Sequence, residues 1–184
     1  MDPKRLVTIS KFLSKHLRHQ PEALGLRLAE GGWVDIPTLL EACAAHGFPI
    51  TRDQLDEVVR TSDKQRFAVD DAGTRIRANQ GHSTPVDLQL EPLEPPAVLF
   101  HGTGKKSVTV ILAFGLLKMK RHHVHLSHEI ATAVKVGQRH GEPVVFAVDS
   151  AAMHARGDVF YRSENGVWLT DHVPAEFLRV IDEM

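Results

Sequence analysis

The chain has 184 residues, 42% of them hydrophobic, which is enough for one large domain or two small ones. Its 22 Lys and Arg residues nearly balance its 23 Asp and Glu residues, so any basic surface must be local. The single cysteine, Cys43, excludes a disulfide framework and a zinc site with several thiolates. No apolar run approaches the roughly 20 residues that span a bilayer. We therefore expect a soluble, cytoplasmic protein with no membrane partner.

The first 83 residues predict three helices and a hairpin. Apolar residues at helical spacing predict a helix over residues 3–18, after which Pro21 disfavours helical backbone. Asp35 suits the N-cap of a second helix that Gly47 ends, and Thr51 with Gln54 forms the capping-box pair of a third. The apolar positions of the three helices are Leu6, Ile9, Leu13, Leu17, Leu39, Leu40, Cys43, Ala44, Leu55, Val58 and Val59.

A hairpin and a proline-rich segment follow these helices. Residues 66–69 and 75–78 alternate in polarity, and the turn-forming residues 70–73 join them. Three helices followed by a hairpin is the order of a winged helix. Residues 84–96 contain four prolines, which resist helix and central strand alike. We therefore expect a linker over residues 84–96 between domains at residues 1–83 and 97–184.

The second half mixes short strands and helices. Strands are expected at residues 98–101, 123–126, 144–148, 159–162, 167–169 and 178–181, and helices at residues 107–114 and 129–139, with Gly115 ending the first of these helices. Helix and strand do not alternate regularly, which favours an α+β fold over a doubly wound parallel sheet. Neither a GxGxxG nor a Walker A phosphate loop is present.

The first helix carries a basic stripe. Lys4, Lys11, Lys15 and Arg18 are spaced by seven, four and three residues, and the stripe leads to His19. It is either a solvated face or a surface that contacts a polyanion and ends at a reactive phosphate. Arginine suits a phosphate because its planar fork can hold two oxygens, and a histidine can move protons near neutral pH. Arg66 by itself is typical of an exposed strand arginine. Residues 76–83 are either a tight exit loop or a segment whose main chain approaches a ligand, and the pattern does not decide between the two.

The second half offers two histidine-containing segments. Phe100-His101-Gly102-Thr103-Gly104 leaves an expected buried strand through two glycines, where it forms either a tight turn or a close approach to a ligand. In the segment around His123 and His125, strand alternation places both rings on one side, together with Arg121 if the strand begins there. A zinc site is the alternative, but no carboxylate or cysteine follows at ligand spacing, so we expect an anion site and no metal. A hairpin around Asn165-Gly166 is expected to pack Tyr161 and Trp168 in the core.

Taken together, these segments resemble the NAD-dependent RNA 2′-phosphotransferases. The resemblance covers nearly the whole chain, and its specificity comes from the joint occurrence of the motifs in this order. One departure is Lys118, where the family pattern has proline. The matching segments are residues 10–19, 32–34, 64–67, 76–83, 101–103, 119–127 and 165–169.

The resemblance implies an amino-terminal winged-helix lobe that engages RNA and a carboxy-terminal ADP-ribosyltransferase-like lobe that binds NAD. It implies that the family's essential Arg-His-Arg-Arg set is Arg18, His19, Arg66 and Arg121. NAD, consumed as a co-substrate, is expected to contact His101, Gly102, Thr103, His125 and Ser127. RNA is expected to contact Lys11, Lys15 and Arg77.

The implied reaction has two steps and no metal. The internal RNA 2′-phosphate attacks the nicotinamide ribose and expels nicotinamide, and the ribose 2″-hydroxyl then attacks phosphorus. The expected products are 2′-hydroxyl RNA and ADP-ribose 1″,2″-cyclic phosphate. The expected substrate is a tRNA-like RNA, as in tRNA splicing, and the enzyme is expected to be a monomer. Two alternatives remain at this point: an ADP-ribosyltransferase that caps terminal phosphates of nucleic acid, and a winged-helix nucleic-acid-binding regulator without activity.

Overall fold

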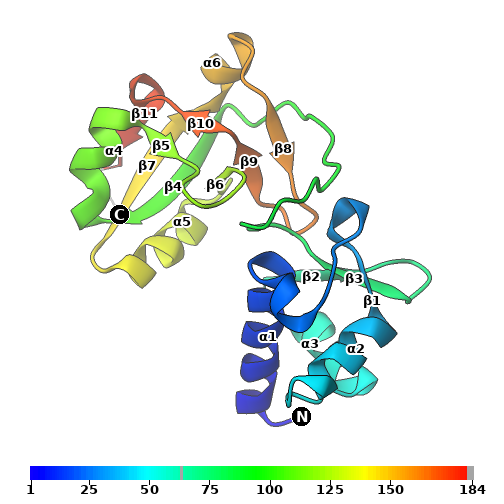
Figure 1. The fold of residues 1–184 in the computed structure, drawn as a ribbon. Helices are drawn as coiled ribbons and strands as arrows, with labels where there is room; N and C mark the ends of the chain where they lie inside the picture. Colours follow the sequence, from blue (N-terminus) through cyan, green and yellow to red (C-terminus); the bar gives the residue numbers. More distant parts are fainter. Residues whose placement is uncertain (63, 182–184) are drawn as a thin grey trace. The chain divides into compact units, whose positions relative to one another are not determined.

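The chain folds into two compact units, Met1–Gln89 and Leu90–Met184, in a computed structural model that describes residues 1–62 and 64–181. We call these the first unit and the second unit (Figure 1). Within the described ranges, no helix is long and apolar enough to cross a membrane. Both units combine helices with sheets, which confirms the expected α+β class.

The first unit contains three helices and a three-stranded antiparallel sheet with the order β1-β3-β2. The expected helices and hairpin are all present, and the two-residue strand β1 was not predicted. The 3-10 turns η1 and η2 join α1 to β1. The bounds are α1 Pro3–Arg18, η1 Pro21–Leu24, η2 Glu30–Gly32, β1 Val34–Asp35, α2 Ile36–Ala45, α3 Arg52–Thr61, β2 Phe67–Val69 and β3 Arg75–Ala78.

Apolar faces of the three helices and the sheet form the core of the first unit. Ile9, Leu13 and Leu17 of α1 are fully buried, as the helical spacing predicts. The capping box at the start of α3 is confirmed, because Thr51 and Gln54 exchange side-chain and main-chain hydrogen bonds of 3.2 Å. The other core residues include Leu39, Cys43, Leu55, Val58, Phe67 and Ile76.

Two further expectations about local structure concern Asp35 and the proline-rich segment. Asp35 occupies the N-cap position of α2, as expected, although its side chain makes no capping hydrogen bond. The proline-rich residues 84–96 contain no helix and no strand beyond a single bridge at Pro92. They are nevertheless fixed by main-chain hydrogen bonds: Asp87 accepts from Gly31 in the first unit, and Leu93 donates to Phe160 in the second.

The second unit is built from three small antiparallel sheets with the orders β11-β7-β4, β6-β9-β8 and β10-β5. The pair β5 and β10 and the helix α6 were not predicted. Its bounds are β4 Val98–Gly104, η3 Lys105–Ser107, α4 Val108–Phe114, β5 Leu116–Leu117, β6 Val124–Leu126, α5 Ile130–Gly137, η4 Gln138–His140, β7 Pro143–Asp149, α6 Ser150–Ala155, β8 Phe160–Arg162, β9 Trp168–Thr170, β10 His172–Val173, η5 Ala175–Phe177 and β11 Leu178–Val180.

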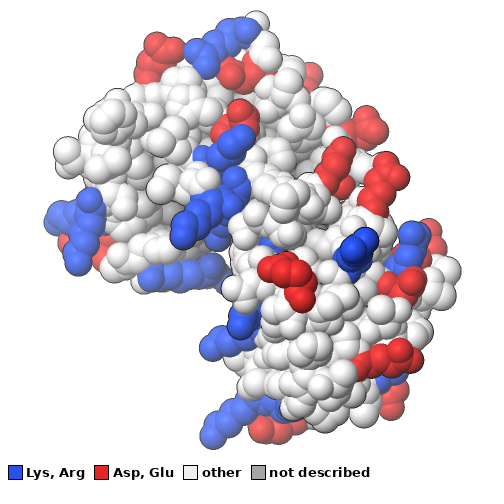
Figure 2. Space-filling view, in the orientation of Figure 1, with Lys and Arg blue, Asp and Glu red and all other residues white. Residues whose placement is uncertain are grey.

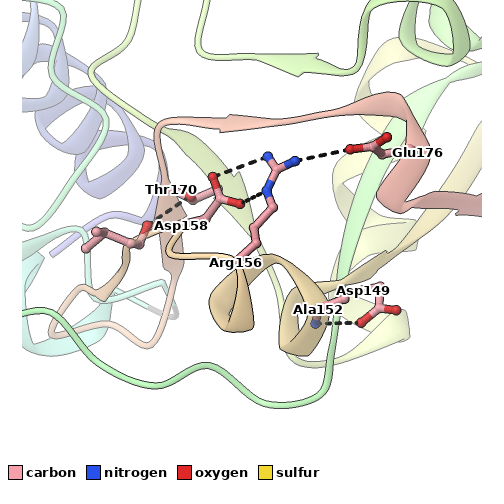
Figure 3. A network of polar contacts seen from close by, with 7 residues as sticks. Asp149, Ala152, Arg156, Asp158, Thr170 and Glu176 are labelled. Carbon is pink, nitrogen blue, oxygen red and sulfur yellow. Dashed lines mark hydrogen bonds and ion pairs between the residues drawn. The ribbon is translucent and has the colours of Figure 1, made fainter.

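The two faces of β4 are covered by different elements. α5 packs on the face of β4 that carries Gly102, while Leu99 on the opposite face is fully buried against the β6-β9-β8 sheet. Trp168 joins that core, as expected, but Tyr161 is only half-buried. At the other end of the unit, Arg156 after α6 bonds both Asp158 and Glu176 and so ties α6 to η5 (Figure 3).

Candidate functional site

The carboxy-terminal end of α1 gathers three of the expected catalytic residues in the first unit. Nη2 of Arg18 donates to the carbonyl oxygen of Arg66 at 3.3 Å. The carbonyl oxygen of Arg18 accepts main-chain hydrogen bonds from Ser83 and Thr84 at 2.9 and 3.2 Å. Nδ1 of the next residue, His19, lies 2.9 Å from Oγ of Ser83. Segments more than 40 residues apart in the sequence therefore meet where α1 ends. We call Arg18, His19 and Arg66 the first-unit cluster.

A basic surface leads along α1 to this cluster. Lys4, Lys11 and Lys15 are exposed, and Arg18 is half-buried at the end of the helix. Figure 2 shows Lys and Arg side chains spaced along the side of the first unit that α1 forms. The helix therefore presents a row of cations that ends beside a histidine.

Arg77 has a different environment from the lysines of α1. Its guanidinium lies 4.6 Å from the ring centre of Trp33, and Nη1 donates to the carbonyl oxygen of Gly31 at 3.3 Å. Arg77 is half-buried, so it packs η2 against β3. Its expected contact with RNA remains a prediction.

In the second unit, β4 and the segment around β6 gather the other expected residues. The main chains of Phe100 and Ser127 exchange two hydrogen bonds of 2.8 Å, which fixes the register of the two segments. Nδ1 of His101 lies 3.0 Å from the carbonyl oxygen of His125. Nη1 of Arg121 lies 3.1 Å from Nδ1 of His125. We call Arg121, His101, His125 and Ser127 the second-unit cluster.

These contacts assign the proton positions on both rings. A carbonyl oxygen only accepts, so Nδ1 of His101 carries the proton and Nε2 of the neutral ring is an acceptor. A guanidinium only donates, so Nδ1 of His125 is the acceptor and its Nε2 carries the proton. Burial lowers the pKa of His101 below its ordinary value of 6.5; the bond to His125 opposes this, and the charges of Arg121 and His140 add to it. His101 is therefore a neutral hydrogen-bond acceptor at pH 7.

The glycines beside His101 have a structural role that corrects the expected strand exit. β4 continues through Gly104, and neither Gly102 nor Gly104 has a positive φ. A Cβ on Gly102 would lie 1.7 Å from the carbonyl oxygen of Ala133 in α5, and a Cβ on Gly104 would lie 2.4 Å from that of His140. Thr103 between them is buried. The glycines thus allow helices to approach the strand closely, and only main-chain atoms of Gly102 can meet a ligand.

His123 lies just before β6, which begins at Val124. The ring of His123 lies edge-on against Tyr161 with 5.5 Å between ring centres, and burial lowers the pKa of His123. Tyr161 and His125 both pair with Leu169 of β9, so His123 contacts the face of the sheet that carries His125. Among residues 1–62 and 64–181, no three His, Cys, Asp or Glu side chains are grouped so that they could hold a metal ion.

Comparison with known proteins places the chain in a family. Residues 4–172 match the model of the RNA 2′-phosphotransferase, Tpt1 / KptA family. The chain belongs to this family. The resemblance found in the sequence is thereby confirmed.

Named relatives of the RNA 2′-phosphotransferase family align over nearly their full length. A probable RNA 2′-phosphotransferase of Nostoc punctiforme is 62% identical over 181 residues, which are 98% of this chain and all of the relative. Those of Trichormus variabilis and Streptomyces coelicolor are 61% and 58% identical over 182 and 179 residues, covering 99% and 97% of this chain and 100% and 97% of the relatives. All residues of both clusters lie inside the region that matches the RNA 2′-phosphotransferase family.

The departure at Lys118 from the RNA 2′-phosphotransferase pattern has a local explanation. Nζ of Lys118 forms an ion pair of 2.6 Å with Asp171, next to β10. The carbonyl oxygen of Lys118 accepts from the main-chain N–H of Arg121 at 3.0 Å. The lysine therefore ties the turn that carries Arg121 to the neighbouring strand by charge, where a proline would restrict the main chain directly.

Proposed function

We propose that this protein transfers an internal 2′-phosphate of RNA to NAD and releases 2′-hydroxyl RNA, ADP-ribose 1″,2″-cyclic phosphate and nicotinamide. The observation that carries the proposal is the full-length family match, which includes one arginine–histidine cluster in each unit. The first-unit cluster suits a polyanion, and the second-unit cluster offers a neutral acceptor suited to a sugar hydroxyl.

The two units have separate roles in this proposal. The first is a winged-helix RNA-binding lobe, supported by its three helices and antiparallel sheet and by the exposed Lys11 and Lys15. Arg77 supports that surface through Trp33. The second is an ADP-ribosyltransferase-like lobe that binds NAD, supported by its small antiparallel sheets and by the neutral ring of His101.

NAD fits the second-unit cluster by its chemistry. Nε2 of His101 accepts a hydrogen bond from a ribose hydroxyl, and Nε2–H of His125 and the hydroxyl of Ser127 donate or accept around it. Main-chain atoms of Gly102 and Thr103 complete the contacts. NAD supplies the electrophilic ribose carbon and a leaving group; the protein supplies orientation and charge.

In the first step, a 2′-phosphate oxygen forms a bond to the ribose carbon and the carbon–nitrogen bond to nicotinamide breaks. In the second, the adjacent 2″-hydroxyl bonds to phosphorus and the bond from phosphorus to the RNA 2′-oxygen breaks. His19 moves the proton from the hydroxyl to the departing oxygen. Arg18, Arg66 and Arg121 stabilise a phosphate of about −1.5 to −2 charge, each bond contributing roughly 1.5–3 kcal/mol. Guanidinium groups supply this charge neutralisation.

The cellular setting follows the same proposal. The substrate is a tRNA-like RNA with an internal 2′-phosphate, as left by splicing, and the enzyme acts as a cytoplasmic monomer.

Nicotinamide release is the test of this function. The protein is mixed with NAD and one of three otherwise identical RNAs, which carry an internal 2′-phosphate, a 2′-hydroxyl or only a terminal phosphate. We expect nicotinamide only with the internal 2′-phosphate. Stable ADP-ribosylated ends on the third RNA would instead indicate a capping ADP-ribosyltransferase, and sequence-specific duplex binding with no turnover would indicate a regulator.

A matched pair of variants checks that the clusters carry this activity. Arg121→Ala removes the arginine that bonds His125, whereas Arg156→Ala removes a guanidinium held by two carboxylates that belong to neither cluster. We expect loss of nicotinamide release in the first variant and little change in the second. Equal loss in both would remove the second-unit cluster from the proposal.

A further inference from the structure

The residue before Arg66 has an unfavourable main-chain conformation. Gln65 has a φ of +40°, in the left-handed region that residues with a side chain rarely adopt. Its N–H donates to the carbonyl oxygen of Ser62 at 2.9 Å, which closes a tight turn just before β2. Because Arg66 follows directly, the direction of its side chain depends on how firmly this turn is held.

Asn79 holds the turn from the end of β3. Its Nδ2 donates to the carbonyl oxygen of Gln65 at 2.6 Å, and its main-chain N–H donates to the carbonyl oxygen of Arg66 at 3.0 Å. One residue therefore fixes two consecutive carbonyl groups. Asn79 is only 5% exposed, so water does not replace these bonds readily.

The orientation of the Asn79 amide is determined by this contact. The carbonyl oxygen of Gln65 can only accept, so the amide nitrogen must face it and Oδ1 must face away. Oδ1 is buried and accepts no hydrogen bond from the described part of the chain. A buried acceptor of this kind has a cost, so the bond made by Nδ2 is the stabilising contact of this side chain.

We propose that Asn79 is a positioning residue that holds the Gln65–Arg66 turn so that the Arg66 guanidinium meets the RNA 2′-phosphate. This inference rests on the proposed function. Arg66 is then fixed on two sides, by Asn79 through the main chain and by Arg18 through the carbonyl oxygen that Arg18 and Asn79 share. Asn79 itself does not touch the reacting atoms.

Asn79→Asp removes only the hydrogen bond from Nδ2 to the carbonyl oxygen of Gln65, because a carboxylate has the same shape as the amide but no N–H to donate. Asn79→Ser is a smaller second variant that removes the amide altogether. We expect each to slow the second chemical step relative to the first by about tenfold, the change that follows from losing one buried hydrogen bond. An RNA-phospho-ADP-ribose intermediate should then accumulate, and we expect the same intermediate in Arg66→Ala.

A double-mutant cycle separates positioning from general stability. If Asn79 acts through Arg66, adding Asn79→Ser to Arg66→Ala should cause no further change in either step. Val58→Ala, a truncation in the core of the same unit that removes no hydrogen bond, is the matched control and should leave the ratio of the two steps unchanged. Additive effects, or the same intermediate in Val58→Ala, would overturn the proposal.

An NMR measurement keeps this test distinct from that of the proposed function. The Nε–Hε signal of Arg66, identified by its loss in Arg66→Ala, should shift and show greater mobility in Asn79→Asp and Asn79→Ser but not in Val58→Ala. An unchanged signal overturns the positioning role whether or not the protein is active. Absence of nicotinamide release by the unaltered protein, with the NMR change present, would refute only the assigned reaction.

Discussion

Arg18 and Arg66 are joined by a hydrogen bond from the guanidinium of the first to the main-chain carbonyl oxygen of the second, at 3.3 Å across 48 residues of sequence. The bond ties the end of α1 to the hairpin. A guanidinium has five N–H donors in a fixed fork, so one arginine can hold its neighbour's main chain and also bind a phosphate. Arg18 therefore has a structural role, holding the main chain of Arg66, that the exposed lysines before it on α1 do not have.

Arg18→Lys should therefore lose activity although the charge is kept. The ammonium group is a point charge and cannot make the bond to Arg66 and a two-oxygen contact at once. We expect about 10- to 100-fold slower phosphate transfer, corresponding to roughly 1.5–3 kcal/mol. Single-turnover rates measure the effect. Arg52→Lys, which alters an exposed arginine paired with Asp56, is the control and should behave like the unaltered protein.

His19→Ala should stop the reaction between its two steps. The imidazole is the expected proton carrier of the second step, and general acid–base groups contribute about 10²- to 10⁴-fold. Gel analysis of labelled RNA should show the ADP-ribosylated intermediate. Ser83→Ala, which removes the 2.9 Å contact to Nδ1, should show the same pattern with a loss of about tenfold. If His19→Ala instead stopped NAD consumption completely, the division of roles between the steps would be wrong.

His101 should make the second unit less stable in mild acid. Its folded-state pKa lies below the ordinary 6.5, mainly because of burial. As pH falls, the unfolded chain therefore binds a proton at His101 before the folded protein does. The contribution of His101 to the free energy of unfolding is complete above pH 6.5 and declines as pH falls below that value. Thermal unfolding between pH 7.5 and 5 should show this decline, and His101→Gln should reduce it. Equal slopes for both proteins would contradict the neutral state assigned to His101.

Gly102→Ala should unfold the second unit rather than weaken one contact to NAD. The added Cβ would lie 1.7 Å from the carbonyl oxygen of Ala133, so α5 has to move away from β4. We expect a destabilisation of about 3 kcal/mol or more, since main-chain overlap cannot be relieved by a rotamer change. Chemical denaturation measures it. Gly157→Ala is the comparison, because no atom lies within 4 Å of the Cβ that it adds. With a φ of +106° at Gly157, its destabilisation measures main-chain strain without atomic overlap.

The α1 lysines should determine the salt dependence of RNA binding. If Lys11 and Lys15 each neutralise one phosphate, each Ala substitution should reduce the slope of log affinity against log salt by about 0.7 for single-stranded RNA. Titration of RNA at several salt concentrations gives the slopes. Lys105→Ala, in the second unit and paired with Glu142, should leave the slope unchanged. An unchanged slope in the Lys11 and Lys15 variants would place the RNA elsewhere.

The sequence predicts long periodic elements well and short, mutually dependent ones poorly. α1 and the α3 capping box follow from local spacing and local hydrogen bonds, so both were predictable. β1 is two residues long and exists because it pairs with β3, and β5 exists because it pairs with β10. Such strands have no periodic signal of their own.

The candidate site shows the same division. Chemistry and family resemblance select the arginines and histidines. They do not predict which of these side chains are fixed by hydrogen bonds, or which residues make those bonds. The sequence around Gly102 suggested a loop close to a ligand. In the structure, α5 occupies the position that a Cβ on Gly102 would take. Asn79 could have lined a ligand or closed a loop, and only the fold shows its bond to Gln65. These contacts join segments distant in sequence, where local patterns carry no information.

Product analysis by mass spectrometry tests the central claim most directly. Purified protein is mixed with NAD and a short RNA that carries one internal 2′-phosphate, beside a working enzyme as control. The account predicts nicotinamide, 2′-hydroxyl RNA and ADP-ribose cyclic phosphate in equal amounts. Unchanged RNA and NAD in the presence of folded protein would contradict it.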